Sequence, residues 1–188
     1  HIDPNYTRAN EVIDGREKIV KTEKVKENGS LNAPKVSKEG HTFKYWSEEP
    51  NGKEYDLSTK VTKDITLYSV YDVNKYTVTF IDKGKEIDKQ ELEAGSVVIA
   101  PKVSMEGYTF KYWSEKENGK EYNLNLPITR NLTLYSVYEI NKYNVEFYDS
   151  NKLIKTIKVD YDNTINSNEV PTVSKIGYTF TGWIENNK

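Results

Sequence analysis

An internal repeat constrains the fold of this chain more than any other feature of its sequence. Residues 34–76 align without a gap on residues 101–143, at an offset of 67, and 29 of these 43 positions are identical. A third copy follows and extends to residues 177–183 (Gly-Tyr-Thr-Phe-Thr-Gly-Trp). A fixed period makes the repeat, and not the whole chain, the unit of folding. We therefore expect small tandem modules, an arrangement better suited to spacing and multivalent contact than to catalysis in one asymmetric cleft.

The period divides the 188 residues into three expected domains. They are repeat 1 (9–72), repeat 2 (76–139) and repeat 3 (143–188), the last expected to be truncated because it lacks a counterpart of the final strand. Repeat 1 has a degenerate start, since Ala9–Ile13 align with the more regular Tyr76–Phe80. Residues 1–8, which open with His-Ile-Asp-Pro, are interpreted as the remainder of an expression tag and a leader.

The charge and the apolar runs exclude two classes of partner. The chain has 27 basic and 29 acidic residues, and this balance argues against a nucleic-acid partner, which selects a basic patch. No apolar run approaches the ~18 residues that a membrane-spanning helix needs, so no membrane insertion is expected. The chain also has no cysteine, so disulfide bonds cannot stabilise the modules.

The second copy shows the strand pattern most clearly. Tyr76, Val78 and Phe80 alternate with threonine, and a period of two predicts a half-buried strand. The segment 87–93 is more polar and predicts a second strand near an edge. A loop or single helical turn follows at residues 101–107, with a positive φ at its final glycine.

The second half of the copy predicts two more strands and a turn. Tyr108–Trp113 read as the third strand, and Asn118-Gly119 supply the two positive φ angles of a tight hairpin. Residues 132–138 have apolar side chains on both faces, which is typical of a strand in the middle of a sheet. Because no segment sustains a period of 3.6, the predicted fold is mainly β, with short helical pieces at most.

Short connections join the copies. The first joint (Asp72–Lys75) and the second joint (Glu139–Lys142) each have four residues and contain neither glycine nor proline. Such a segment differs from a flexible Gly/Ser linker. We therefore expect neighbouring modules to be held within a limited range of angles, as an elongated array.

Three motifs together resemble those of a known family. Gly-Tyr-Thr-Phe-x-x-Trp, Thr-Leu-Tyr-x-x-Tyr and Tyr-x-Val-x-Phe are similar to the Listeria–Bacteroides repeat, the B-repeat of the internalin surface proteins. The resemblance covers nearly all of residues 9–183, and residues 177–183 match its signature best. The first two copies depart from it, because Tyr45 and Tyr112 stand where glycine usually precedes the tryptophan. Tyr71 and Tyr138 stand where the family often ends its last strand with tryptophan.

The resemblance implies a β-grasp-like module, α+β with little helix, in a bacterial protein of the cell surface or a secreted one. It brings no catalytic residues. The implied function is non-catalytic: a semi-rigid spacer or stalk, with an adhesive protein-interaction role in some members. A host or cell-surface protein, or a glycan, is the partner that this function implies.

Two alternatives use other features of the chain. Repeated aromatic residues would suit a carbohydrate- or cell-wall-binding module if they are exposed; a small core would bury them instead. The candidate ligand contacts are Tyr45, Trp46, Tyr112, Trp113 and Trp183. The chain could also be an accessory region of a larger secreted enzyme whose catalytic domain lies elsewhere.

No residue cluster predicts catalysis, a cofactor or a metal. His41 is replaced by tyrosine in the other two copies, so it is a poor candidate ligand. Asp160 and Asp162 lack the spacing of a calcium loop, and solvated charge explains them. The open edge of the third copy is the remaining candidate contact, because an unpaired strand edge is a template for another chain. We expect this copy to be either the least ordered or completed by strand exchange with a neighbouring molecule.

Overall fold

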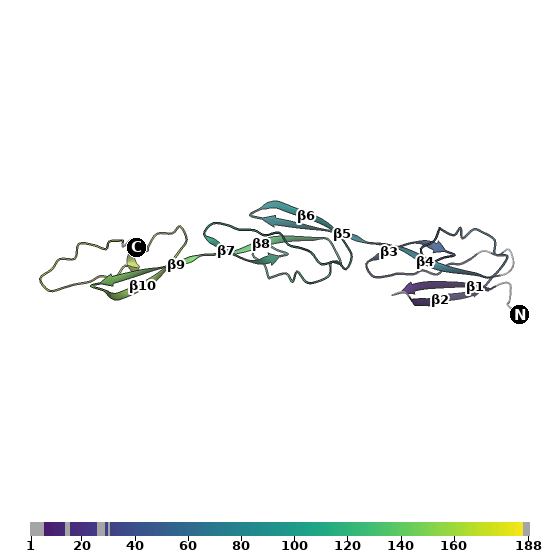
Figure 1. Ribbon diagram of the computed structural model, residues 1–188, viewed down its shortest axis with the longest axis horizontal. Coiled ribbons are helices and arrows are strands. Elements are labelled where there is room, and N and C mark those ends of the chain that lie inside the picture. The colour runs from purple at the N-terminus through teal and green to yellow at the C-terminus, as the bar shows by residue number, and fades with distance from the viewer. Residues whose placement is uncertain (1–5, 14–15, 26–28, 30, 186–188) are drawn as a thin grey trace. The chain divides into compact units, whose positions relative to one another are not determined.

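The computed structural model describes residues 6–13, 16–25, 29 and 31–185 (Figure 1). These residues form ten β-strands and a single turn of 3₁₀ helix, without an α-helix among them. The first five residues, part of the expected tag remnant, lie outside the described ranges. The mainly β class of small tandem modules is confirmed.

The first repeat is a four-stranded sheet with the order β2-β1-β4-β3. The two central strands β1 and β4 run parallel, whereas both outer pairs are antiparallel. The strands are β1 (Tyr6–Ile13), β2 (Arg16–Lys24), β3 (His41–Ser47) and β4 (Ile65–Val73).

The second repeat has the same strand order, β6-β5-β8-β7. As predicted, β6 is an edge strand and β8 lies in the middle of the sheet. The same bulge recurs as well, at Phe43/Tyr45 in the first sheet and at Phe110/Tyr112 in the second. The strands are β5 (Lys75–Asp82), β6 (Lys85–Glu93), β7 (Tyr108–Ser114) and β8 (Leu132–Ile140).

The third repeat forms a two-stranded sheet of β9 (Lys142–Asp149) and β10 (Lys152–Asp160), followed by the 3₁₀ turn η1 (Ser167–Glu169). The third strand, predicted for the repeat from Tyr108–Trp113, is expected at residues 178–183 of this copy. It does not form there, because the stretch has only the isolated bridge from Lys175 to Tyr178. The reason is pairing: β3 and β7 each bond only to β4 or β8. The described part of repeat 3 contains no counterpart of those two strands.

The register of the first copy differs from the one predicted. β1 begins at Tyr6 and β5 at Lys75, 69 positions later, whereas β3 and β7 begin at His41 and Tyr108, 67 positions apart. The connection before β3 is therefore two residues longer in repeat 1. The predicted alignment of residues 9–13 with residues 76–80 is therefore wrong by two positions.

The prediction for the Asn-Gly turns needs correction. Asn51 and Asn118 have positive φ angles of 54° and 52°, but the glycine that follows each does not. Gly119 is required for space instead, because an added Cβ would lie 2.6 Å from Ser114 Oγ. Residues 101–107 form a loop, the first of the two predicted options, and Gly107 has the expected positive φ, 74°.

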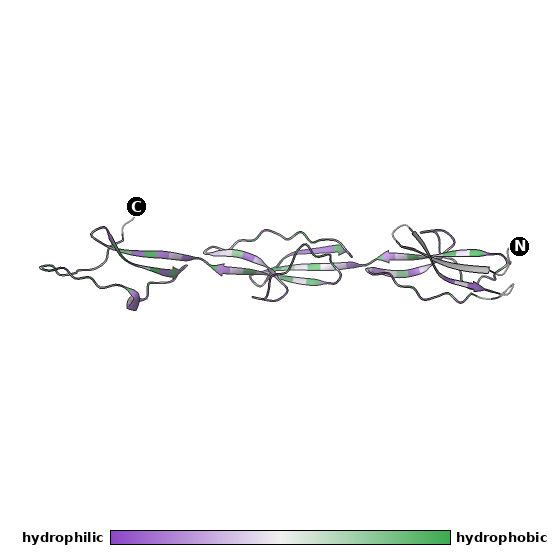
Figure 2. Cartoon of the chain, turned by 90° about the horizontal axis from the view of Figure 1, so that it is seen from below, coloured by the Kyte–Doolittle hydropathy of each residue, from purple (hydrophilic) through white to green (hydrophobic). Residues whose placement is uncertain are grey.

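Each complete repeat has its own small core. In repeat 1, Trp46, Ile65 and Leu67 are buried together, with half-buried apolar side chains around them. In repeat 2 the most deeply buried apolar side chains are those of Val78, Phe80, Ile128 and Leu134. Figure 2 shows hydrophilic and hydrophobic residues alternating along the strands, as the period of two predicts.

The chain divides into two compact units, and the division passes through repeat 2. The first unit comprises residues 1–78, 89–99 and 124–132, and the second comprises 79–88, 100–123 and 133–188. Each joint between repeats therefore lies inside a single unit: the first joint in the first unit, the second joint in the second.

Candidate functional site

Asn74 is the single residue between β4 and β5, and it bonds to both neighbouring repeats. Its N–H donates to the carbonyl oxygen of Gly40 (2.8 Å), and its own carbonyl oxygen accepts from the N–H of Ala94 (2.7 Å). Its side-chain Oδ1 accepts from Thr42 Oγ1 at 2.6 Å. Gly40 and Thr42 belong to repeat 1 and Ala94 to repeat 2. Asn74 is therefore hydrogen-bonded to both repeats that meet at the first joint.

Asn141 repeats this arrangement at the second joint. Its N–H donates to the carbonyl oxygen of Gly107 (2.9 Å), and its carbonyl oxygen accepts from the N–H of Tyr161 (2.8 Å). Thr109 Oγ1 donates to its Oδ1 at 2.7 Å. Each of the three bonds has its counterpart at the first joint. The three contacts therefore recur with the repeat. We call the asparagine and its three hydrogen bonds the Asn clamp (Asn74 at the first joint, Asn141 at the second).

Two features require glycine at the position whose carbonyl oxygen accepts the N–H bond of the Asn clamp. Gly40 and Gly107 have φ angles of 67° and 74°, a region that L side chains rarely adopt. A Cβ at Gly107 would also lie 1.9 Å from the ring of Tyr161, and one at Gly40 would lie 2.9 Å from the Cβ of Ala94. The loop before the third strand of one repeat therefore packs closely against the next repeat at both joints.

Tyr161 adds an electrostatic contact at the second joint. Its hydrogen bond to the Glu106 carboxylate, together with the negative charge of that group, raises the pKa of Tyr161. Exposed ion pairs also flank each joint: Lys44–Asp72 at 3.2 Å and Lys111–Glu139 at 3.0 Å. Pairs this exposed contribute about 0–1 kcal/mol each. These ion pairs are therefore minor contacts beside the hydrogen bonds of the Asn clamp and the close packing at the two glycines.

The aromatic candidates for ligand contact lie largely inside the repeats. Trp46 and Trp113 expose only 3% and 2% of their surfaces, so neither offers the face that a stacked sugar needs. The hydroxyl groups of the half-buried Tyr45 and Tyr112 donate to the carbonyl oxygens of Gly52 and Gly119, both at 3.2 Å. These two tyrosines therefore fasten the Asn-Gly turns.

Trp183 is less enclosed than its two counterparts. It is half-buried, its ring lies 5.0 Å from that of Phe147, and its Nε1 donates to the carbonyl oxygen of Pro171 at 3.2 Å. Its neighbour Phe180 is exposed. Among the three tryptophans predicted as ligand contacts, this one retains accessible ring surface, and ligand binding there stays a prediction.

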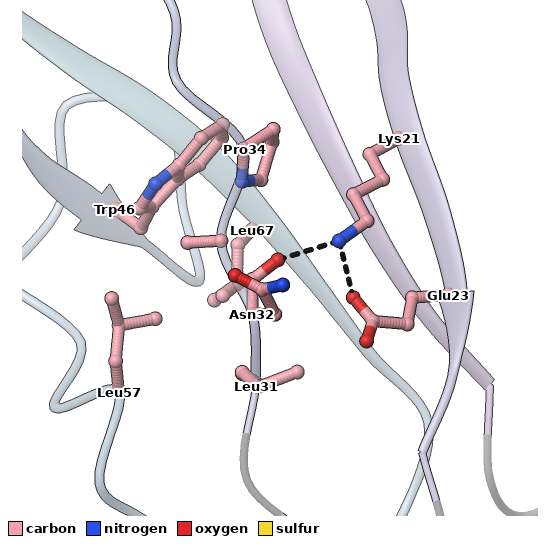
Figure 3. A pocket seen from close by; sticks show the side chains of 9 residues that line it. Lys21, Glu23, Leu31, Asn32, Pro34, Trp46, Leu57 and Leu67 are labelled. Atoms are coloured by element: carbon pink, nitrogen blue, oxygen red, sulfur yellow. Dashed lines mark hydrogen bonds and ion pairs between the residues drawn. The ribbon is translucent and has the colours of Figure 1, made fainter.

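A small pocket in repeat 1 lies beside Trp46 (Figure 3). Lys21 Nζ donates to the carbonyl oxygen of Asn32 (2.7 Å) and pairs with the Glu23 carboxylate (2.6 Å), and leucines line the apolar side. In repeat 2, Gln90 at the corresponding strand position donates to the carbonyl oxygen of Ile99 at 2.7 Å. The polar edge of this pocket is thus a strand-to-loop tie that the repeats share.

Repeat 2 also encloses a polar cluster that sequence reasoning missed. Asp82, at the end of β5, is only 8% exposed. Its Oδ1 accepts hydrogen bonds from Ser136 Oγ (2.7 Å) and from the Tyr138 hydroxyl (2.8 Å), both on β8. Lys83 Nζ lies 3.6 Å from its other oxygen. We call Asp82, Ser136 and Tyr138 the carboxylate cluster. The available signal was the Ser-Val-Tyr sequence that both complete copies share.

The carboxylate cluster shifts the pKa of two of its members. Burial raises the pKa of Asp82, but the hydrogen bonds from Ser136 and Tyr138, together with the nearby Lys83, outweigh it and bring that pKa below its ordinary value. Burial and the Asp82 carboxylate raise the pKa of Tyr138 to about 12. Asp82 is therefore held ionised and Tyr138 neutral across the physiological pH range.

One donor of this cluster has an unbonded counterpart in repeat 1. Ser69 corresponds to Ser136, and its hydroxyl is buried without a hydrogen-bond partner among the described residues. β1 ends at Ile13, where β5 ends at Asp82. The corresponding strand position in repeat 1 thus carries no carboxylate.

The described residues include neither a group of acidic, histidine or cysteine side chains placed to hold a metal ion nor a helix long and apolar enough to cross a membrane. Asp160, weighed above as a calcium ligand, instead forms an ion pair with Lys142 at 3.0 Å.

Comparison with known proteins identifies relatives among bacterial proteins. A putative membrane protein of Evansella cellulosilytica is 33% identical over 157 residues, which make up 78% of this chain and 24% of that protein. A putative Gly-rich membrane protein of the same organism is 32% identical over 155 residues, 79% of this chain and 18% of that protein. Internalin H of Listeria monocytogenes is 31% identical over 137 residues, 69% of this chain and 24% of that protein. The chain thus spans about a quarter or less of the length of these relatives.

The match to a family model follows the repeats. Residues 11–70, 76–137 and 143–188 each match the Listeria-Bacteroides repeat domain. The three matched segments cover most of the chain and agree with the motifs that carried the resemblance. The chain therefore belongs to the Listeria-Bacteroides repeat family.

Proposed function

We propose that this chain is a non-catalytic segment of a bacterial surface or secreted protein, and that it acts as a semi-rigid spacer. The Asn clamp is the observation that carries this proposal. Asn74 and Asn141 each bond to both neighbouring repeats through three hydrogen bonds, and a flexible linker would have no use for such bonds. The same three bonds recur at both joints, which supports a mechanical role for the repeat.

The relatives support the surface assignment. Two of them are named putative membrane proteins and one is internalin H, and this chain matches a quarter or less of each. A tandem segment of that relative size suits a stalk that separates other parts of a larger protein. An adhesive contact with a host or cell-surface protein or glycan would be an additional role of the same segment.

The spacer proposal is tested by measuring a distance across the first joint. The chain has no cysteine, so Lys53→Cys and Lys120→Cys, at exposed corresponding positions of two repeats, accept spin labels without competition. Double electron–electron resonance should give a narrow distance distribution. Asn74→Ala combined with Thr42→Val removes the side-chain bond of the Asn clamp and should broaden that distribution.

The matched control is Asp72→Ala, which removes an exposed ion pair beside the joint and leaves the Asn clamp in place. Its distribution should stay as narrow as that of the parent. A parent distribution as broad as that of a variant with Gly-Ser-Gly-Ser inserted after Asn74 would overturn the spacer proposal.

A further inference from the structure

A chemically reactive pair recurs in the two complete repeats. Asn51-Gly52 and Asn118-Gly119 follow the third strand of their sheets at corresponding positions. Asparagine is a labile residue, and it is most labile before glycine, whose nitrogen is an unhindered nucleophile toward the asparagine side chain. The fold nevertheless requires glycine here, because an added Cβ would lie 2.5 Å from Ser47 Oγ in repeat 1 and 2.6 Å from Ser114 Oγ in repeat 2.

The reaction of such a pair is deamidation in two steps. The glycine nitrogen loses its proton and forms a bond to Cγ of the asparagine, and the side-chain nitrogen leaves as ammonia. Water then opens the resulting succinimide ring at either of its carbonyl carbons, which gives aspartate or isoaspartate. One water molecule is consumed and one ammonia is released without oxidation or reduction, so the solvent supplies the co-reactant.

The folded turn holds the glycine nitrogen away from this reaction. The N–H of Gly119 donates to the carbonyl oxygen of Lys116, and that of Gly52 donates to the carbonyl oxygen of Glu49, both at 3.0 Å. To reach the side-chain carbon of the preceding asparagine, the peptide group of the glycine must rotate and give up this bond. The backbone hydrogen bond thus opposes ring closure in both repeats.

Two side chains fix the turn of repeat 2 further. The hydroxyl group of the half-buried Tyr112 donates to the carbonyl oxygen of Gly119 at 3.2 Å. Ser114 is 1% exposed, and its Oγ accepts from the N–H of Lys116 at 3.3 Å. The Asn118 side chain is itself exposed, so access of water does not limit the reaction. The fixed backbone of the turn does.

The turn of repeat 1 has the same contacts. The Tyr45 hydroxyl donates to the carbonyl oxygen of Gly52 at 3.2 Å, and Ser47 Oγ accepts from the N–H of Glu49 at 3.2 Å. Asn51 is exposed as well. Each complete repeat therefore contains a labile pair together with the bonds that restrain it.

We propose that Asn51 and Asn118 are deamidation sites which the folded turn keeps closed and which local opening of the turn exposes. Isoaspartate lengthens the main chain by one carbon, and either product adds a carboxylate to a turn that is fitted to an ordinary peptide. A repeat that has opened is thereby permanently marked. This modification does not depend on the spacing role, and its test is independent of that role.

The first test compares the whole chain with a synthetic peptide of residues 114–122 (Ser-Glu-Lys-Glu-Asn-Gly-Lys-Glu-Tyr) at neutral pH. Peptide mapping by mass spectrometry measures aspartate and isoaspartate at each site. Asn118 in the folded chain should deamidate at least about tenfold more slowly than in the peptide, because the hydrogen bonds of the turn must first open. A third pair, Asn28-Gly29, lies partly outside the described ranges and is mapped separately.

The second test loosens one turn at a time. Tyr112→Phe removes the hydroxyl bond to Gly119, so deamidation of Asn118 should become about two- to tenfold faster, while Asn51 keeps the parent rate. Tyr45→Phe should have the opposite pattern, so each variant contains its own reference site. Hydrogen exchange of the Gly119 amide should rise in Tyr112→Phe by the same factor, because the same backbone bond must break.

The matched control is Val78→Ala, which opens a cavity in the core of repeat 2 and leaves the turn unchanged. It should leave the rate at Asn118 near that of the parent, because global unfolding is rarer than the opening of one turn. Acceleration as large as in Tyr112→Phe would assign the reaction to global unfolding and overturn the local gate.

Two further results would overturn the proposal. One is an equal rate at Asn118 in the folded parent and in the peptide, a comparison that depends on no variant. The other is a Tyr112→Phe chain in which exchange of the Gly119 amide rises while deamidation of Asn118 stays at the parent rate.

Discussion

Tyr138 donates a hydrogen bond of 2.8 Å to the carboxylate of Asp82, which lies 56 positions earlier in the chain. Ser136 donates to the same oxygen at 2.7 Å. Two residues of β8 thus bond to the carboxylate at the end of β5, on the neighbouring strand.

The first prediction compares two serines at corresponding positions. Ser136→Ala removes a donor from the buried Asp82 carboxylate, so the free energy of unfolding of repeat 2 should fall by about 1–3 kcal/mol. Ser69→Ala removes a buried hydroxyl that has no hydrogen-bond partner in the described part of the chain, so it should be neutral or slightly stabilising. Chemical denaturation of both variants measures the difference, and equal losses would show that the carboxylate cluster adds nothing.

The second prediction concerns acid. The pKa of Asp82 is lower in the folded chain than its ordinary value, so its ionised form favours folding. The contribution is fully present above the unfolded value of about 3.9. It is lost as the pH falls through the lower folded value, because the unfolded state then binds the proton more readily. Urea unfolding between pH 5 and pH 2 should therefore show a fall in stability that is smaller in Asp82→Asn.

The third prediction concerns alkaline pH, where stability should fall as the pH rises and not as it falls. The folded chain raises the pKa of Tyr138 from 10.0 to about 12. Between these values the folded state keeps the phenolic proton and the unfolded state releases it, so stability falls as the pH rises through this range. Tyr138→Phe should flatten the alkaline part of the stability curve. An unchanged slope between pH 10 and pH 12 would contradict the assigned shift.

A fourth prediction contrasts two tryptophans. Trp113 is almost fully buried, and its ring lies 4.8 Å from that of Phe80, so Trp113→Ala should destabilise repeat 2 by about 3–5 kcal/mol. Trp183 is only half-buried, and Trp183→Ala should cost clearly less. Thermal unfolding followed by near-ultraviolet circular dichroism measures the stability loss of each variant. A loss below about 1 kcal/mol for Trp113→Ala, together with lost glycan binding, would instead favour a carbohydrate-binding module.

The sequence predicted most strands because their signal is local. β5, β7 and β8 follow from alternating apolar residues within each segment, and the position of β8 in the middle of the sheet follows from apolar residues on both of its faces. Residues 178–183 carry the same local pattern as β7, yet they form no strand. Strand formation also needs a partner, and the pattern of one segment says nothing about its neighbour.

The candidate site was harder to predict than the fold. The carboxylate cluster depends on Asp82 and Tyr138 meeting across neighbouring strands, and that match is set by the register of the whole sheet. The short length of the joints was visible in sequence, but the three bonds of Asn74 were not. Two of them use backbone atoms, which leave no trace in residue identity.

The last prediction separates backbone strain from crowding at the second joint. Gly84 and Gly107 have the same φ angle of 74°, but a Cβ at Gly84 meets nothing within 4 Å, whereas one at Gly107 would lie 1.9 Å from the Tyr161 ring. Gly84→Ala should therefore cost only the left-handed conformation, about 1–2 kcal/mol. Gly107→Ala should cost more and should also displace Tyr161, which is seen as a change in its ring resonances.

The variant Tyr161→Ala supplies the control for this comparison. In that background Gly107→Ala has no ring to meet, so its cost should fall to that of Gly84→Ala, measured by thermal unfolding. Spin labels at exposed positions on either side of the second joint, such as Lys120 and Lys152, should show a broadened distance distribution for Gly107→Ala and an unchanged one for Gly84→Ala. Equal costs for the two glycine variants in the parent chain would mean that Tyr161 does not pack on Gly107 in solution. In that case the Asn clamp alone would order the joint.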